Sequence, residues 1–299
     1  MVSDPSALIG SLADAGYLAD RGLATVAYLA MKLERPLLVE GEAGVGKTSL
    51  AAALASVVDG PLIRLQCYDG IDAAQALYEW DHARQLLALR AGEATGSLSG
   101  HDAAAAESDL YAERFLVRRP LLQAISFPVG SPRPVLLIDE VDRADDEFEA
   151  LLLEVLSEYS ITIPELGPQS ALVRPIVILT SNRTRDLHDA LKRRCLYHWV
   201  EHPSIEREIA IVRLRAPQVS PVVAQQVATL VSHFRDLGLY KPPGVAEAVD
   251  WAMALSVLGA ELTVESALDT LGTVVKYRED RSRIEAADLG AMIDATRAP

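Results

Sequence analysis

A glycine-rich segment near the N-terminus constrains the fold more than any other part of this sequence. It reads Gly41-Glu42-Ala43-Gly44-Val45-Gly46-Lys47-Thr48 and satisfies the pattern G-x-x-x-x-G-K-T. The apolar run 37–40 precedes it, and the Ala/Leu-rich run 49–58 follows it. The first run predicts a buried strand and the second a helix. The segment is therefore expected to be a strand-to-helix turn, the setting in which such a loop binds phosphate.

The residue types of this loop suit the phosphates of ATP. Its glycines let the backbone curl so that N–H groups point at phosphate oxygens, and the following helix adds its N-terminal dipole. Lys47 adds a cation, and the Thr48 hydroxyl can bind Mg²⁺. We therefore predict that Gly41, Glu42, Ala43, Gly44, Val45, Gly46, Lys47, Thr48 and Ser49 bind the nucleotide. The alternative is an ordinary turn without a ligand.

An acidic pair follows a second apolar run, residues 135–138. Ligands of open α/β sheets gather at the carboxyl ends of the strands, where Asp139 and Glu140 are expected. Asp139 is predicted to hold Mg²⁺ through water, and Glu140 to orient and deprotonate the attacking water. An acidic pair after a strand can also be a helix N-cap, which is the simpler alternative.

Thr180-Ser181-Asn182 ends a further apolar run, residues 176–180. The Asn182 amide is predicted to hydrogen-bond the attacking water or the terminal phosphate. Because Ser and Asn are also common in turns, plain turn chemistry is the alternative.

Lys192-Arg193-Arg194 ends a helix expected to begin near Asp186. Basic residues at a helix C-terminus are favoured by the helix dipole alone. The functional interpretation is an arginine finger, offered to the ATP of a neighbouring subunit. A guanidinium presents a planar fork to phosphate, so Arg194 is the first candidate, Arg193 the second and Lys192 the weakest.

Strand-like and helical runs alternate through the first two thirds of the chain, which predicts a parallel sheet with helices on both faces. Strands are expected at 37–40, 61–65, 135–138, 176–180 and 196–200, with a strand or hairpin at 161–163. Helices are expected at 7–34 (two, broken near Gly10 and Gly22), 49–58, 73–90 and 145–158. Residues 91–113 read as a flexible loop or insertion. The predicted class is an α/β P-loop core, residues 1–202, followed by a smaller all-α lid domain, residues 203–299.

The composition of the chain limits its possible functions and its location. The net charge of −14 argues against a broad nucleic-acid footprint, which needs concentrated Lys and Arg. The two cysteines, Cys67 and Cys195, are expected to be reduced thiols. No signal peptide or membrane-spanning run is evident, so a cytoplasmic location without an integral membrane segment is expected.

Four elements follow one another along the chain: the phosphate loop, the acidic pair, the polar strand end at Asn182 and the basic helix end at Arg194. In this order, and followed by a helical domain, they resemble an AAA+ ATPase. Two stretches resemble its MoxR branch: Asp139-Glu140-Val141-Asp142-Arg143-Ala144 and Phe148-Glu149-Ala150-Leu151-Leu152-Leu153-Glu154. Three more resemble the CoxD type, encoded with molybdenum-containing carbon monoxide dehydrogenases: Tyr68-Asp69-Gly70-Ile71-Asp72, Tyr78-Glu79-Trp80-Asp81 and Ala190-Leu191-Lys192-Arg193-Arg194-Cys195.

This resemblance implies a homo-hexameric ring with Mg²⁺ and ATP at its subunit junctions. It also implies a chaperone that works with a von Willebrand factor A domain partner to remodel or mature a metalloenzyme client. Tyr68 and Trp80 would be candidates for a pore-facing loop, although a place in the core is the expectation for large aromatics.

One departure from the MoxR pattern lies in the helical domain. Relatives carry Ser-Pro-Arg there, whereas this chain has Tyr240-Lys241-Pro242-Pro243-Gly244-Val245, with no arginine at the matching place. Lys241 could substitute only as a point charge and is offset from the matching place, so coupling of the ATP state to domain movement is expected to run differently here.

Two other classes share the same core. A nucleic-acid motor or clamp-loader-like protein is disfavoured by the net charge. A nucleotide switch or small-molecule kinase would leave the trans arginines without a neighbour to serve.

Overall fold

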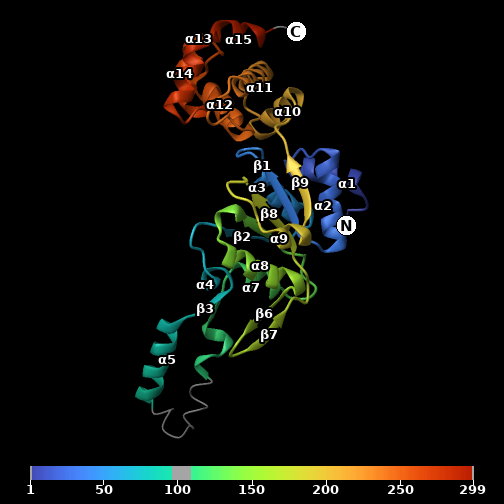
Figure 1. Cartoon of the computed structure of the whole chain (residues 1–299), viewed down its shortest axis with the longest axis vertical. Helices are drawn as coiled ribbons and strands as arrows, with labels where there is room; N and C mark the ends of the chain where they lie inside the picture. Colours follow the sequence, from blue (N-terminus) through green and yellow to red (C-terminus); the bar gives the residue numbers. More distant parts are fainter. Residues whose placement is uncertain (1, 96–108, 298–299) are drawn as a thin grey trace. The chain divides into compact units, whose positions relative to one another are not determined.

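The computed structural model describes residues 2–95 and 109–297. Its central element is a five-stranded sheet with the strand order β2-β5-β8-β1-β9 (Figure 1). The strands are β1 (Leu37–Gly41), β2 (Leu62–Gln66), β5 (Val135–Asp139), β8 (Ile176–Ser181) and β9 (Leu196–Val200). β5 pairs in parallel with β2 on one side and with β8 on the other. The fold is the parallel-sheet P-loop α/β fold expected from the sequence.

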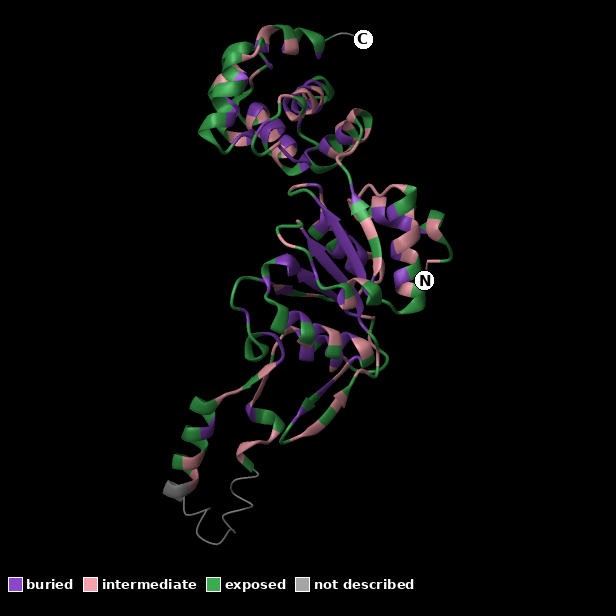
Figure 2. Cartoon of the chain, in the orientation of Figure 1, coloured by how far each residue is buried: buried purple, intermediate pink, exposed green. Residues whose placement is uncertain are grey.

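Three of these strands are buried along their whole length, which explains why they are continuous apolar runs. Every residue of β1, β5 and β8 is buried, and Figure 2 shows these strands in the colour of buried residues. Strands covered on both faces by helices lose the alternation of apolar and polar residues that a half-exposed strand keeps.

Helices and two small antiparallel ribbons complete this part of the chain. The helices are α1 (Pro5–Asp14), α2 (Arg21–Leu33), α3 (Lys47–Val57), α4 (Ala73–Ala76), α5 (His82–Thr95), α7 (Pro120–Ile125), α8 (Asp146–Glu158) and α9 (Asp189–Arg194). Short 3-10 turns lie at Glu113–Phe115 and Val141–Arg143. β3 (Tyr78–Trp80) pairs with β4 (Leu116–Arg118), and β6 (Ser160–Ile163) pairs with β7 (Gly167–Ser170).

The chain from Ile205 onward is helical. The helices are α10 (Ile205–Arg215), α11 (Pro221–Asp236), α12 (Val245–Leu258), α13 (Val264–Val274), α14 (Arg278–Ala286) and α15 (Leu289–Ala295). They enclose a core of their own, in which the rings of Phe234 and Trp251 stack with centroids 5.8 Å apart. The indole Nε1 of Trp251 donates a 2.7 Å hydrogen bond to Thr270 Oγ1, so the polar atom of this buried ring is satisfied.

The structure corrects several sequence predictions. The break between the first two helices lies at residues 15–20, and Gly10 and Gly22 are inside α1 and α2. The helix predicted at 73–90 is interrupted by β3, because Tyr78–Trp80 pairs with a strand remote in sequence. The helix expected from Asp186 begins at Asp189. Of the loop predicted at 91–113, α5 occupies the part up to Thr95, and residues 96–108 lie outside the described part.

Close contacts divide the chain into two compact units. Of the described residues, one contains 25–39, 54–95 and 109–198, including β5, β8 and the acidic pair. The other contains residues 2–24, 40–53 and 199–297, which places the phosphate loop with the C-terminal helices. Within residues 2–95 and 109–297, no helix is long and apolar enough to cross a bilayer.

Candidate functional site

The glycine-rich loop connects β1 to α3, as expected, and its conformation requires glycine. Gly44 has φ +78° and Gly46 has φ +95°, values that residues with a Cβ rarely adopt. α3 then begins at Lys47, so the N–H groups of its first turn lie at the end of the loop. Such a helix terminus attracts anions through its unpaired N–H groups and its dipole.

Lys47 is buried against the loop, with only 6% of its surface exposed. Its ammonium donates to the carbonyl oxygens of Gly41, at 2.8 Å, and Glu42, at 2.6 Å. A buried cation needs such partners to offset its lost hydration. The positive charge is therefore held on the loop itself.

The start of α12 contacts the same loop, inside the same compact unit. The N–H groups of Val245 and Ala246 donate to the Gly44 carbonyl, at 3.1 and 3.3 Å. A Cβ built on Gly44 would lie 2.8 Å from Glu247 Oε2. The α12 side chain that lies beside Gly44 is thus an acid. Lys241, the offset alternative considered from the sequence, donates its backbone N–H to Asp280 at 3.0 Å.

The acidic pair belongs to the other compact unit. Asp139 ends β5 and is 3% exposed. Its Oδ1 accepts from the Thr180 hydroxyl and its Oδ2 from Arg64 Nη2, each at 2.6 Å. This buried carboxylate therefore has a cationic partner, Arg64, that the sequence interpretation missed. Arg64 lies in the middle of β2, and an arginine within a strand does not by itself indicate a functional site.

Glu140 follows in a left-handed conformation, with φ +55° and ψ +49°. Residues with a Cβ pay for this conformation, and such strain concentrates at functional sites. Its Oε2 accepts from Gln66 Nε2 and from Arg143 Nη1, both at 3.1 Å. Its backbone N–H donates to Thr180 Oγ1 at 2.9 Å. The same hydroxyl thus contacts both members of the acidic pair.

Asn182 lies just beyond β8, and a buried carboxylate holds its backbone. Asp142, 2% exposed, accepts from the N–H of Asn182 at 3.2 Å. It also accepts from the N–H and the hydroxyl of Thr184, at 2.8 and 2.7 Å. Asp142 therefore joins the turn after β5 to the turn after β8. The sequence interpretation used Asp142 only as part of a family motif.

The candidate finger residues lie at the C-terminus of α9, where Arg193 and Arg194 are exposed. Their carbonyl oxygens accept from the guanidinium of Arg35, at 2.9 and 3.0 Å. The end of the helix is thus anchored by its backbone, and the side chains are not part of the core. The role in trans stays a prediction.

The two candidate pore aromatics differ. Tyr68 is 42% exposed, so the expectation of a core position is wrong for it. Trp80 is half-buried, packs on the core and meets Tyr111 edge to face at a centroid distance of 5.2 Å.

Both cysteines are free thiols and buried. Burial raises the pKa of Cys67 to about 12, and the nearby carboxylates of Asp139, Asp142 and Glu140 add to this shift. Burial also raises the pKa of Cys195 to about 12, opposed by Arg35. Neither thiol is a nucleophile near neutral pH, because only the thiolate reacts.

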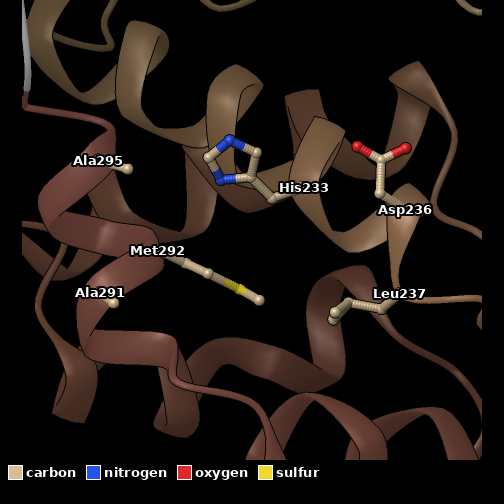
Figure 3. A pocket seen from close by; sticks show the side chains of 6 residues that line it. All are labelled: His233, Asp236, Leu237, Ala291, Met292 and Ala295. Carbon is tan, nitrogen blue, oxygen red and sulfur yellow. The ribbon is translucent and has the colours of Figure 1, made fainter.

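A separate hollow of about 380 Å³ lies in the helical part (Figure 3). It is lined by His233, Asp236, Leu237, Ala291, Met292 and Ala295. None of the predicted site residues lines this hollow, so it does not belong to the candidate site.

The sheet, the glycine loop leading into a helix and the acidic strand end define a P-loop nucleoside triphosphatase of the α/β class. Residues 36–195, more than half of the chain, match the family described as AAA domain (dynein-related subfamily). The chain belongs to this family. The AAA+ class expected from the sequence is confirmed, and the MoxR branch stays a prediction.

Solved structures of Thermotoga maritima RuvB are similar to this chain. One of them, a RuvB mutant, is 16% identical, with 90% of this chain and 72% of that chain covered and a TM-score of 0.49. The structure titled RuvB Holliday junction branch migration motor is 17% identical, with 84% and 67% covered and a TM-score of 0.44. No curated protein matches the chain.

Proposed function

We propose that this protein hydrolyses ATP and acts as an oligomeric AAA+ remodelling motor of the MoxR type. The observation that carries the proposal is the extent of the family match. Residues 36–195 contain the phosphate loop, the acidic pair, Asn182 and both candidate finger arginines.

Features within each compact unit support the binding of Mg²⁺ and ATP. The loop has two left-handed glycines ahead of a helix N-terminus, which is suited to phosphate oxygens. The buried Asp139 carboxylate already has a cation, Arg64, as its partner, so this position stabilises positive charge. Bound Mg²⁺ would neutralise charge on the phosphates. Thr48 and Asp139 are the residues that would hold it.

Each remaining residue has one task in this proposal. Lys47 and the loop N–H groups bind phosphate oxygens. Glu140 orients the attacking water and accepts its proton at the carboxylate. Asn182 hydrogen-bonds the same water or the terminal phosphate. Arg194, or Arg193, stabilises charge on the transferred phosphoryl group of a neighbouring subunit.

The test of the ATPase is Glu140→Gln, which keeps the shape of the side chain but removes the base. We expect binding of a fluorescent ATP analogue to persist, while phosphate release falls about 100-fold or more. Glu154→Gln on α8, an exposed glutamate, is the matched control and should leave both measurements unchanged. A Glu140→Gln protein that turns over at the normal rate would refute the assignment.

The finer part of the proposal is a homo-hexamer that works with a von Willebrand factor A domain partner on a metalloenzyme client. It is supported by the sequence motifs around the acidic pair and α9. Solution mass with and without ATP tests the ring, and a stable monomer under both conditions counts against it. An ATPase rate strongly stimulated by DNA would favour a nucleic-acid motor instead.

A further inference from the structure

Arg64 reaches from the protein surface to the carboxylate proposed to hold Mg²⁺. It lies in β2, whose register pairs Gln66 with Asp139 of β5. A single nitrogen, Arg64 Nη2, lies 2.6 Å from Asp139 Oδ2 and 2.6 Å from Gln66 Oε1. The guanidinium is thus placed on the acid by the pairing of two strands whose residues are far apart in sequence.

The two members of this ion pair differ greatly in exposure. The side chain of Asp139 is 4% exposed, whereas that of Arg64 is 53% exposed. The carboxylate is fixed in the sheet and keeps its hydrogen bond from Thr180 on the other oxygen. Displacing Arg64 would leave Asp139 with its hydrogen bond from Thr180, and the charge of Arg64 would move into water.

One of the two oxygens through which Asp139 would hold Mg²⁺ already accepts from the Arg64 cation. Mg²⁺ binds carboxylates directly or through its tightly held waters, and in both cases it needs these oxygen lone pairs. Two cations close to one oxygen also repel each other. The arginine and the metal therefore compete for the same acid.

We propose that Arg64 is a positioning residue that occupies Asp139 when no metal is bound and is displaced when Mg²⁺ and ATP bind. The inference rests on the proposed ATPase function and goes beyond it. It makes Arg64 a determinant of how strongly nucleotide binding depends on Mg²⁺. An ion pair of purely structural importance would contribute to folding and leave that dependence unchanged.

The test compares nucleotide affinity with and without Mg²⁺ in the full-length protein. A fluorescent ATP analogue is titrated in Mg²⁺ and in EDTA, and the ratio of the two affinities is taken. Loss of a nearby positive charge changes both affinities, so the ratio isolates the metal. For Arg64→Met, which keeps the aliphatic stem, we expect the ratio to rise about fivefold, as suits a half-exposed ion pair.

Arg143→Met is the matched control. Arg143 is 52% exposed and pairs with Glu140, so its removal takes the same charge from beside the acidic pair but leaves the hydrogen bonds of Asp139 in place. The ratio of nucleotide affinities in Mg²⁺ and in EDTA should be the same for Arg143→Met as for the wild type. Arg64→Lys keeps the charge but loses the planar fork, so it should raise the ratio about twofold, less than Arg64→Met does.

The outcomes distinguish a failure of the proposed role of Arg64 from a failure of the proposed ATPase function. An unchanged or lowered ratio in Arg64→Met would overturn the role of Arg64. A wild-type protein that binds no nucleotide in Mg²⁺ would overturn the proposed function itself. If Arg64→Met does not fold, Arg64→Lys is measured in its place. An unchanged ratio of nucleotide affinities in that variant would overturn the role of Arg64.

Discussion

The buried carboxylate of Asp142 organises the turn that carries Asn182, and Asp142→Asn tests this directly. Oδ1 and Oδ2 both lie 3.2 Å from the N–H of Asn182. Oδ2 also accepts from the N–H and the hydroxyl of Thr184, at 2.8 and 2.7 Å. Asparagine keeps the shape but replaces one oxygen with an amide donor and removes the charge.

The expected loss follows from these contacts. Hydrogen bonds to a charged group contribute about 1.5–3 kcal/mol, and neutral ones about 1 kcal/mol. Making the two Thr184 bonds neutral therefore loses about 1 kcal/mol each. The Asn182 N–H keeps one acceptor at 3.2 Å but then also faces the new amide donor, which costs about 1 kcal/mol more. Asp142→Asn should lower the free energy of unfolding by about 3 kcal/mol.

Urea unfolding followed by circular dichroism measures the global effect, and amide hydrogen exchange at Thr184 measures the local one. Asp145→Asn is the control for the change in charge. Asp145 caps α8 by accepting from the Phe148 N–H at 2.9 Å, and asparagine caps a helix equally well. The control should change stability by less than about 0.5 kcal/mol. A loss below about 1 kcal/mol in Asp142→Asn, with Thr184 exchange unchanged, would refute the reasoning.

Two further predictions concern the finger and the thiols. Arg194→Ala should lower ATP hydrolysis only in assembled rings, with Arg193→Ala the weaker variant; an equal loss in a monomer would remove the role in trans. Cys67 and Cys195 should resist iodoacetamide in the folded protein at pH 8 and react after urea unfolding, because burial raises both pKa values to about 12. Since these values lie above the ordinary 9.0, the thiols support folding fully below pH 9, and this support is lost as the pH rises toward 12. Rapid alkylation of the native protein at pH 8, followed by mass spectrometry, would contradict the burial argument.

The main elements of the core were predictable because their signals are local. A strand buried on both faces must be apolar throughout, so β1, β5 and β8 stand out as runs. The phosphate loop is equally local, because its left-handed turns need glycine at fixed positions. The helix predicted across residues 73–90 failed for the opposite reason. β3 exists through its pairing with β4, and the partner strand is not visible in a local window.

The sequence by itself determined the order of phosphate loop, acidic pair and polar strand end, together with the chemistry that each residue type can perform. Only the tertiary structure decided what those residues touch. Arg64 reaches Asp139, and Asp142 holds Asn182, through the pairing and turns of strands remote in sequence. Glu247 lies beside Gly44 because the start of α12 packs on the phosphate loop. Strand pairing and helix packing lower the free energy by bringing together residues that are distant in sequence. Because no local pattern records these long-range contacts, the partners are seen only in the folded chain.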